Sequence, residues 1–200
     1  MLLTFSVNAE ELTVMCFGDS ITHKGLWVKM VDEDPLFKTV NAGKSGRKAA
    51  EAKESLAVYL KEHRKADKLI MFLGTNDLPA RDKRPGNVKV DLCVKNMAAA
   101  IDLALKSFKP QDIILVGPCS VNPRTMSEVN LKKGYDITGP LLIQLGEKYN
   151  ELADKKGLKF LSLLNVVSPE NYKDGLHPDK AGDEEIAKAV LAFLKSNYPD

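Results

Sequence analysis

A serine near the amino end of the chain is the first candidate for chemistry. Ser20 follows Gly18 and Asp19 directly after an apolar, strand-like run, so its hydroxyl would lie at a strand end. A turn of this composition is common, because glycine, aspartate and serine are ordinary turn formers. Ser20 alone is therefore a weak sign of a nucleophile, and its meaning depends on what else the chain offers.

Near the carboxyl end, one loop holds the two partners that a serine nucleophile requires. Asp174 and His177 lie three residues apart, beside Gly175 and Pro178. A serine hydroxyl attacks poorly unless a base removes its proton, and an imidazole, with an ordinary pKa of about 6.5, suits that task near neutral pH. A carboxylate beside the imidazole would fix its tautomer and stabilise the imidazolium. His177 could also help to cap the helix that is expected after it.

Two further turns contain groups that could stabilise an oxyanion. The segment 41–46 follows one expected strand, and the segment 74–77 follows another. The backbone N–H groups of Ser20 and Gly46 and the side-chain amide of Asn76 could bind the charge that forms on a carbonyl oxygen during acyl transfer, where one donor is worth roughly 3 to 4 kcal/mol. Gly46 could instead only permit a tight turn, and Asn76 could only tie down its loop. The presence of both favours the oxyanion role.

These four blocks, in this order, resemble the SGNH (GDSL-type) hydrolase family. The blocks are Gly18-Asp19-Ser20, Asn41-x-Gly43-x-x-Gly46, Gly74-Thr75-Asn76-Asp77 and Asp174-x-x-His177-Pro178, and they span nearly the whole chain. Ile21 stands where the familiar variant of the first block has leucine. The resemblance implies Ser20 as nucleophile, His177 as base and Asp174 as its partner. It also implies that Ser20, Gly46 and Asn76 donate to the oxyanion.

Within that family, the chain looks most similar to bacterial arylesterases and to short-chain acyl or carbohydrate esterases. The resemblance rests on the run 16–20, the basic, proline-containing insert after Asp77, and Gly117-Pro118. It implies a serine esterase that hydrolyses short acetyl- or aryl-type esters through an acyl-enzyme, with no cofactor or metal. The alternatives are a carbohydrate O-deacetylase, a thioesterase or lysophospholipase of the same family, or a non-catalytic glycan-binding domain. The expected partner is a small-molecule ester, such as an acylated sugar.

Six more residues are candidate substrate contacts because of their positions. They are Asp19, His23, Trp27, Arg81, Arg84 and Arg124. His23 could line the cleft beside Ser20 or be a plain loop residue, and Trp27, the only tryptophan, could wall the pocket or anchor the helix that follows it. The arginines lie in two long connections, 78–87 and 118–139, where loops after strands often set specificity. Surface arginines more often only solvate such loops.

The elements that must position these residues alternate between strand-like and helix-like segments. Apolar runs predict strands at 12–17, 37–41, 68–73, 112–116 and 159–161. Helical spacing of apolar residues appears at 49–59, 90–105, 141–152 and 186–194. This alternation predicts a three-layer α/β/α sandwich with a five-stranded, mostly parallel, flavodoxin-like sheet. Ligands bind such sheets beyond the carboxyl ends of the strands, where Ser20, Gly46 and Asn76 would meet.

The composition is that of a globular enzyme. With 200 residues, 44% of them hydrophobic, the chain can fill one core, and we expect a single domain over residues 12–198. Its 29 basic and 27 acidic residues leave a net charge of +2, which shows no nucleic-acid footprint. The three cysteines lack metal-binding spacing and indicate free thiols. Neither a phosphate-binding loop nor a dinucleotide-binding glycine pattern is present, since position 38 is lysine and the first turn has one glycine.

Residues 1–11 form a separate N-terminal segment. The run 2–9 resembles the end of an export signal with a small-x-Ala cleavage site, although no basic residue precedes it. This pattern favours a periplasmic or secreted protein, and a cytosolic N-terminus is the alternative. No apolar run approaches the roughly 20 residues needed to span a bilayer, so no integral membrane protein is predicted. Nothing in the sequence separates an oligomer interface from the core stripes.

Overall fold

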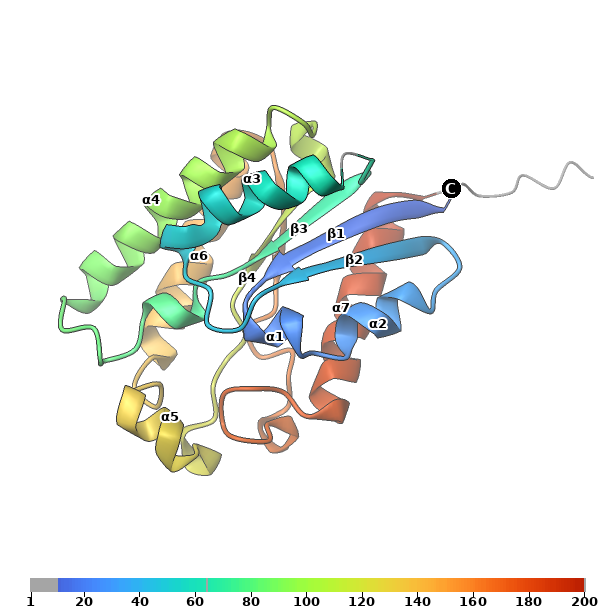
Figure 1. The fold of residues 1–200 in the computed structure, drawn as a ribbon. Coiled ribbons are helices and arrows are strands. Elements are labelled where there is room, and N and C mark those ends of the chain that lie inside the picture. Colours follow the sequence, from blue (N-terminus) through green and yellow to red (C-terminus); the bar gives the residue numbers. More distant parts are fainter. Residues whose placement is uncertain (1–10, 64, 200) are drawn as a thin grey trace, which may run out of the picture.

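The computed structural model describes residues 11–63 and 65–199 (Figure 1). Five strands of this part of the chain form one sheet in the order β2-β1-β3-β4-β5, and every neighbouring pair is parallel. The strands are β1 (Leu12–Gly18), β2 (Phe37–Gly43), β3 (Lys68–Phe72), β4 (Ile113–Gly117) and β5 (Lys159–Ser162). The strand limits predicted from the sequence differ from these by at most two residues. The predicted flavodoxin-like sandwich is confirmed.

Helices cover both faces of the sheet and give it two hydrophobic cores. The helices that cover the sheet are α2 (Trp27–Asp32), α3 (Ala52–Glu62), α4 (Gly86–Ala104), α6 (Gly139–Lys156) and α7 (Lys180–Asn197). Helices α3, α4 and α6 lie on one face and α2 and α7 on the other (Figure 1). Met15 and Phe17 of β1 face the core beneath α3, α4 and α6, whereas Val14 and Cys16 face the core beneath α2 and α7. Because successive strand residues alternate between faces, a strand buried on both sides is a continuous apolar run.

Short helices and single turns complete the connections. They are α1 (Ser20–His23), α5 (Glu128–Lys133), η1 (Ala49–Glu51), η2 (Thr75–Asp77), η3 (Pro110–Asp112), η4 (Pro123–Thr125) and η5 (Pro169–Asn171). Side chains fix where the helices begin: Asp19, Ser127 and Asp179 accept backbone N–H groups at the starts of α1, α5 and α7. Gly134, with φ of 73°, ends α5 in the left-handed conformation that glycine adopts without strain.

The loops that follow the strands gather at one edge of the sheet. Gly18 and Gly43 are register partners at the ends of β1 and β2, so the chain leaves both strands at the same level. A Cβ atom on Gly18 would lie 2.0 Å from Thr22 Oγ1 and 2.9 Å from the carbonyl oxygen of Phe72, which leaves room only for glycine. This close approach packs α1 directly against the end of β1.

The predicted N-terminal segment lies outside the described residues except for Glu11. Among the helices of the described part, none is long and apolar enough to cross a membrane. All three cysteines are buried and free, in agreement with the predicted thiols.

Candidate active site

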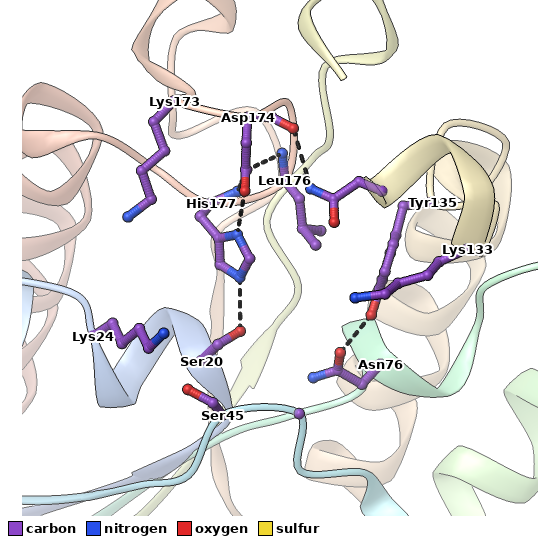
Figure 2. A pocket seen from close by; sticks show the side chains of 12 residues that line it. Ser20, Lys24, Ser45, Asn76, Lys133, Tyr135, Lys173, Asp174, Leu176 and His177 are labelled. Carbon is purple, nitrogen blue, oxygen red and sulfur yellow. Dashed lines mark hydrogen bonds and ion pairs between the residues drawn. The ribbon is translucent and has the colours of Figure 1, made fainter. Parts of the chain in front are cut away.

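Ser20 begins helix α1 immediately beyond β1. Asp19 Oδ1 accepts the backbone N–H of Ile21 at 2.9 Å, which starts the helix at Ser20 and turns the chain sharply. The serine side chain is only partly buried and faces a cavity (Figure 2). The local sequence therefore delivers a hydroxyl to the carboxyl edge of the sheet, as the strand–turn pattern predicts.

His177 links Ser20 to Asp174 through two short hydrogen bonds (Figure 2). Ser20 Oγ lies 2.9 Å from His177 Nε2, and His177 Nδ1 lies 2.8 Å from Asp174 Oδ2. With the proton on Nδ1, the ring donates to the carboxylate and leaves Nε2 free to accept the serine hydroxyl. The arrangement can therefore pass a proton from Ser20 to the imidazole and stabilise the charge that results.

The Asp174 carboxylate is held by more than the imidazole. Its Oδ1 accepts the backbone N–H groups of Leu176 at 3.1 Å and His177 at 2.7 Å. Burial by itself would raise the pKa of Asp174, but the hydrogen bonds from the His177 backbone and ring, with that from Leu176, lower the pKa below its ordinary value. Asp174 is consequently ionised at neutral pH and holds the ring in one orientation.

Asp174 and His177 lie in a hairpin-like loop, residues 172–178, which is called the tip here. Tyr172 and Pro178 form an isolated antiparallel bridge, and the backbone N–H of Lys173 donates to the carbonyl oxygen of His177 at 3.0 Å. Gly175 turns the chain with φ of 76°, and a Cβ atom there would lie 2.6 Å from the carbonyl oxygen of Asn122. Only glycine combines this conformation with so close a neighbour.

The connection between β4 and α6, residues 118–138, braces the tip and is called the α5 segment here. The Gly175 carbonyl accepts the backbone N–H of Asn122 at 2.8 Å. The Asp174 carbonyl accepts the backbone N–H of Ser127 at 3.1 Å and the Asn130 side-chain amide at 3.2 Å. The position of the acid therefore depends on a segment more than 30 residues earlier in the chain.

Asn76 lies across the cavity from His177 (Figure 2). It forms hydrogen bonds with three other residues. Its Oδ1 accepts the Tyr135 hydroxyl at 2.6 Å. Its Nδ2 donates to Asp19 Oδ2 and to the Arg47 carbonyl oxygen, both at 3.2 Å. The hydrogen bond from the Tyr135 hydroxyl thus fixes the orientation of the Asn76 side-chain amide. Sequence reasoning missed Tyr135, because no local pattern marks a tyrosine that reaches Asn76 from the α5 segment.

Asp19 is buried beneath the site and has an unusual electrostatic environment. Its side chain is 2% exposed. Burial raises the pKa of Asp19 to about 7; the backbone hydrogen bond from Ile21 opposes this rise, Asp77 adds to it, and Arg47 reduces it. Asp19 does not line the cavity. The structure therefore places it as a support for Asn76 and α1, not as the substrate contact that the sequence suggested.

Arg47 is a second residue that sequence reasoning missed. Its guanidinium is buried, donates to the carbonyl oxygens of Gly18 at 2.7 Å and Ala42 at 2.6 Å, and stacks over the Phe17 ring at 4.2 Å. It thereby ties the end of β1 to the end of β2 beside Gly46, which has φ of 77° and is exposed. This tie sets where the turn after β2 lies relative to Ser20.

The cavity at Ser20 has a volume of about 370 Å³. Its lining consists of Ser20, Lys24, Ser45, Gly46, Asn76, Asn130, Lys133, Tyr135, Lys173, Asp174, Leu176 and His177. The structure thus brings together all five residues that the sequence proposed for the nucleophile, base, acid and oxyanion donors. It adds three lysines that sequence reasoning did not single out.

His23 and Trp27 lie near Ser20 but not in the cavity lining. His23 is exposed, and its Nδ1 lies 3.0 Å from the hydroxyl of Ser45, so it contacts a residue of the lining. Trp27 is fully buried, and its Nε1 donates to the Ile21 carbonyl oxygen at 3.0 Å. The position of Trp27 supports an anchoring role, which is one of the two roles that the sequence left open for it.

The three candidate arginines also lie outside the lining. Arg84 is held by Asp82, two residues away, with Nε donating to Oδ1 at 3.0 Å. Arg124 faces a different hollow, which Ser120 and Tyr172 also line. Arg81 is exposed; its backbone N–H donates to the carbonyl oxygen of Lys133 at 3.1 Å, which joins the loop after Asn76 to the α5 segment. Across residues 11–63 and 65–199, no group of three or more metal-ligating side chains is found.

Comparison with known proteins identifies the family. The model of the GDSL-like Lipase/Acylhydrolase family matches residues 16–184. The chain belongs to this family. As a GDSL-like hydrolase, it is a carboxylic-ester hydrolase, as the four sequence blocks predicted. A search of curated proteins finds no significant match.

Several solved structures share the fold at low sequence identity. Est24, a carbohydrate acetylesterase from Sinorhizobium meliloti, is 17% identical with a TM-score of 0.77, over 94% of this chain and 100% of that one. An aryl esterase from M. smegmatis is 19% identical with a TM-score of 0.72, over 92% of this chain and 99% of that one. A lipase/acylhydrolase from Enterococcus faecalis is 20% identical with a TM-score of 0.71, over 92% and 96%. These similarities establish a common fold.

Proposed function

We propose that this protein is a serine esterase that cleaves short acyl esters in two steps through an acyl-enzyme. The observation that carries the proposal is the continuous line of hydrogen bonds from Ser20 Oγ through the His177 ring to Asp174, at 2.9 and 2.8 Å. A cavity of about 370 Å³ adjoins the serine, a size that suits a small ester.

The proposed mechanism uses His177 twice. Ser20 Oγ attacks the ester carbonyl carbon while its proton passes to His177 Nε2; the bond to the alcohol oxygen then breaks, and the imidazolium returns the proton to that oxygen. Water next gives a proton to His177 and attacks the acyl carbon. The Ser20–acyl bond breaks, and the serine regains its proton. Ionised Asp174 stabilises the imidazolium in both steps.

Three donors are proposed for the oxyanion of each step. They are the backbone N–H groups of Ser20 and Gly46 and the Asn76 side-chain amide, all from residues of the cavity lining. In the free protein, Asn76 Nδ2 is bonded to Asp19 and to the Arg47 carbonyl at 3.2 Å, the long end of the hydrogen-bond range. Substrate binding would replace one of these long bonds with a bond to the oxyanion.

The lining favours a polar substrate over a long acyl chain. Leu176 is the only aliphatic side chain among its members, while Ser45, Asn130 and Tyr135 supply hydroxyl and amide groups. An acetylated sugar and an aryl acetate therefore both belong in the first substrate set.

The test compares hydrolysis of p-nitrophenyl acetate, butyrate and decanoate by the wild type and by Ser20→Ala. We expect acetate to be the best substrate and the variant to lose at least about 10⁴-fold in kcat. Ser107→Ala, at an exposed serine beyond the far end of α4, is the matched control. Phenylmethylsulfonyl fluoride should add one sulfonyl group, on Ser20, as measured by peptide mass. Retained activity in Ser20→Ala, or labelling elsewhere with full inhibition, would overturn the proposal.

A further inference from the structure

Three lysines from distant parts of the chain line the cavity beside Ser20. Lys24 directly follows α1, Lys133 ends α5, and Lys173 lies in the tip that holds the acid. Figure 2 shows Lys24 and Lys173 on the side of His177 and Lys133 beside Tyr135. Each lysine thus shares a short element with a residue of the site, so their positions relative to the serine are set by the same backbone.

None of these three lysines forms an ion pair within the described part of the chain, although Lys173 offsets part of the rise in pKa that burial causes at Asp183. The lysines that do form ion pairs there are Lys38, Lys44, Lys68, Lys132, Lys148, Lys156, Lys180 and Lys195. Asp174 is the only acidic member of the lining, and its oxygens are already engaged by His177 and Leu176. Three positive charges therefore face the cavity with a single carboxylate that is turned toward the imidazole.

We infer that the preferred substrate is a small ester that carries an anionic group, a carboxylate or a phosphate, outside the scissile bond. This inference rests on the serine esterase function proposed above. A cleft lined by one sign of charge focuses its field on the opening, which raises the local concentration and the association rate of an oppositely charged ligand. Charge-assisted hydrogen bonds from lysine to such a group would then fix the ester relative to Ser20.

A neutral ester can accept hydrogen bonds from these three side chains but offers them no negative charge to pair with. The oxyanion of the reaction forms on the carbonyl oxygen, for which Ser20, Gly46 and Asn76 are the proposed donors. An alternative role for the lysines is to hold the carboxylic acid that every ester hydrolysis releases. That role predicts inhibition by the product acid for charged and neutral esters alike, and no preference between them.

The test measures kcat/KM for pairs of esters that differ by one charge. Phenyl acetate and 3-acetoxybenzoate place the charge on the alcohol side, and p-nitrophenyl butyrate and mono-p-nitrophenyl succinate place it on the acyl side. Monoacetylglycerol and its phosphate form the third pair, which separates phosphate from carboxylate. We expect the anionic member to be preferred at least about tenfold in one pair or more, with each ion pair worth up to about fivefold.

Lysine variants identify the source of that preference. Lys24→Gln, Lys133→Gln and Lys173→Gln should each lower the ratio of kcat/KM, anionic over neutral, by about two- to fivefold, and the triple variant should bring it close to one. Lys106→Gln is the matched control, because Lys106 is exposed beyond the end of α4, at the opposite edge of the sheet. The lysines are surface side chains of the cavity, and a thermal melt of each variant verifies folding.

Salt gives a second measurement that needs no substitution. Raising the ionic strength from about 0.01 M to 1 M shortens the screening length from about 30 Å to about 3 Å, so the wild-type ratio should fall toward that of the triple variant. A ratio near one in all three pairs, with active enzyme, would overturn the anionic-substrate inference and leave the esterase intact. A preference that survives in the triple variant would also overturn it. Failure to hydrolyse any ester of either kind would instead refute the proposed function.

Discussion

Substitution of Tyr135 by phenylalanine should slow the reaction by acting through Asn76. The change removes only the hydroxyl that donates to Asn76 Oδ1 at 2.6 Å and keeps the ring, which is 3% exposed. Without that donor, only the two long bonds from Asn76 Nδ2 to Asp19 and to the Arg47 carbonyl, both at 3.2 Å, hold the amide, and nothing holds its oxygen. We therefore expect the amide to sample orientations in which it cannot donate to an oxyanion.

The size of the effect follows from two limits. Complete loss of an oxyanion donor lowers kcat by about 10²- to 10³-fold, which is the expectation for Asn76→Ala. A single hydrogen bond contributes about 0.5 to 1.5 kcal/mol, equivalent to about 2- to 13-fold. Tyr135→Phe should consequently lower kcat by about 2- to 13-fold, with KM changed less than about twofold, since the interaction is made to the transition state.

The assay is steady-state hydrolysis of p-nitrophenyl acetate, with a thermal melt of each protein. Tyr198→Phe is the control, because its hydroxyl donates to the Gln111 carbonyl at 2.5 Å, beyond the amino end of β4. Tyr135→Phe in an Asn76→Ala background tests the route: the tyrosine should then have little further effect. Additive losses, an unchanged kcat, or a loss confined to KM would refute the reasoning.

Two further predictions concern stability. Burial raises the pKa of Asp19 from 3.8 to about 7 in the folded protein. Between these pH values the unfolded chain therefore binds fewer protons than the folded one, and the free energy of unfolding falls as the pH rises. Asp19→Asn should flatten the dependence of Tm on pH between about 4 and 7; an unchanged slope would exclude Asp19 as its source. Gly18→Ala should destabilise by about 3 kcal/mol or more in urea unfolding, because its Cβ would lie 2.9 Å from a backbone carbonyl. A Cβ atom on Gly46 would meet no atom within 4 Å, so Gly46→Ala adds only the strain of a left-handed backbone. It should lower the free energy of unfolding by about 1 to 2 kcal/mol and keep kcat within about tenfold. Equal losses of stability from Gly18→Ala and Gly46→Ala would contradict this argument.

The strands could be predicted because burial on both faces leaves little freedom in sequence. Val14, Met15, Cys16 and Phe17 are all fully buried, two toward each core, and appear as one apolar run. Parallel strands also share a carboxyl edge, so polar residues that follow such runs can be expected to meet there. This reasoning places Ser20, Gly46 and Asn76 around one cavity, as the structure does.

The lysines of the cavity could not be predicted, because the residue type does not reveal which way a side chain points. Lys132 and Lys133 are neighbours at the end of α5. Lys132 is 80% exposed and lies 3.8 Å from Glu128 on the helix surface, while Lys133 faces the cavity. Consecutive helix residues point about 100° apart, and the docking of α5 against the loop after Asn76 decides which of the two faces the cavity. Hydrogen bonds of that docking run between backbone groups, which carry no sequence signal. For Arg84 the sequence does contain the relevant signal, because the residue that binds its guanidinium, Asp82, lies only two positions earlier.

The α5 segment contributes both to the shape of the cavity and to the position of the loop that carries Asp174 and His177. Its side chains Asn130, Lys133 and Tyr135 form part of the cavity wall, while its backbone and the Asn130 amide hold the carbonyl groups of Asp174 and Gly175. Exchanging the whole segment to change which esters fit would therefore also move Asp174 and His177, the proposed acid and base. Redesign of selectivity in this protein should replace Lys133 alone and leave Asn122, Ser127 and Asn130 untouched, because new specificity reached by loop grafting would be accompanied by a slower enzyme.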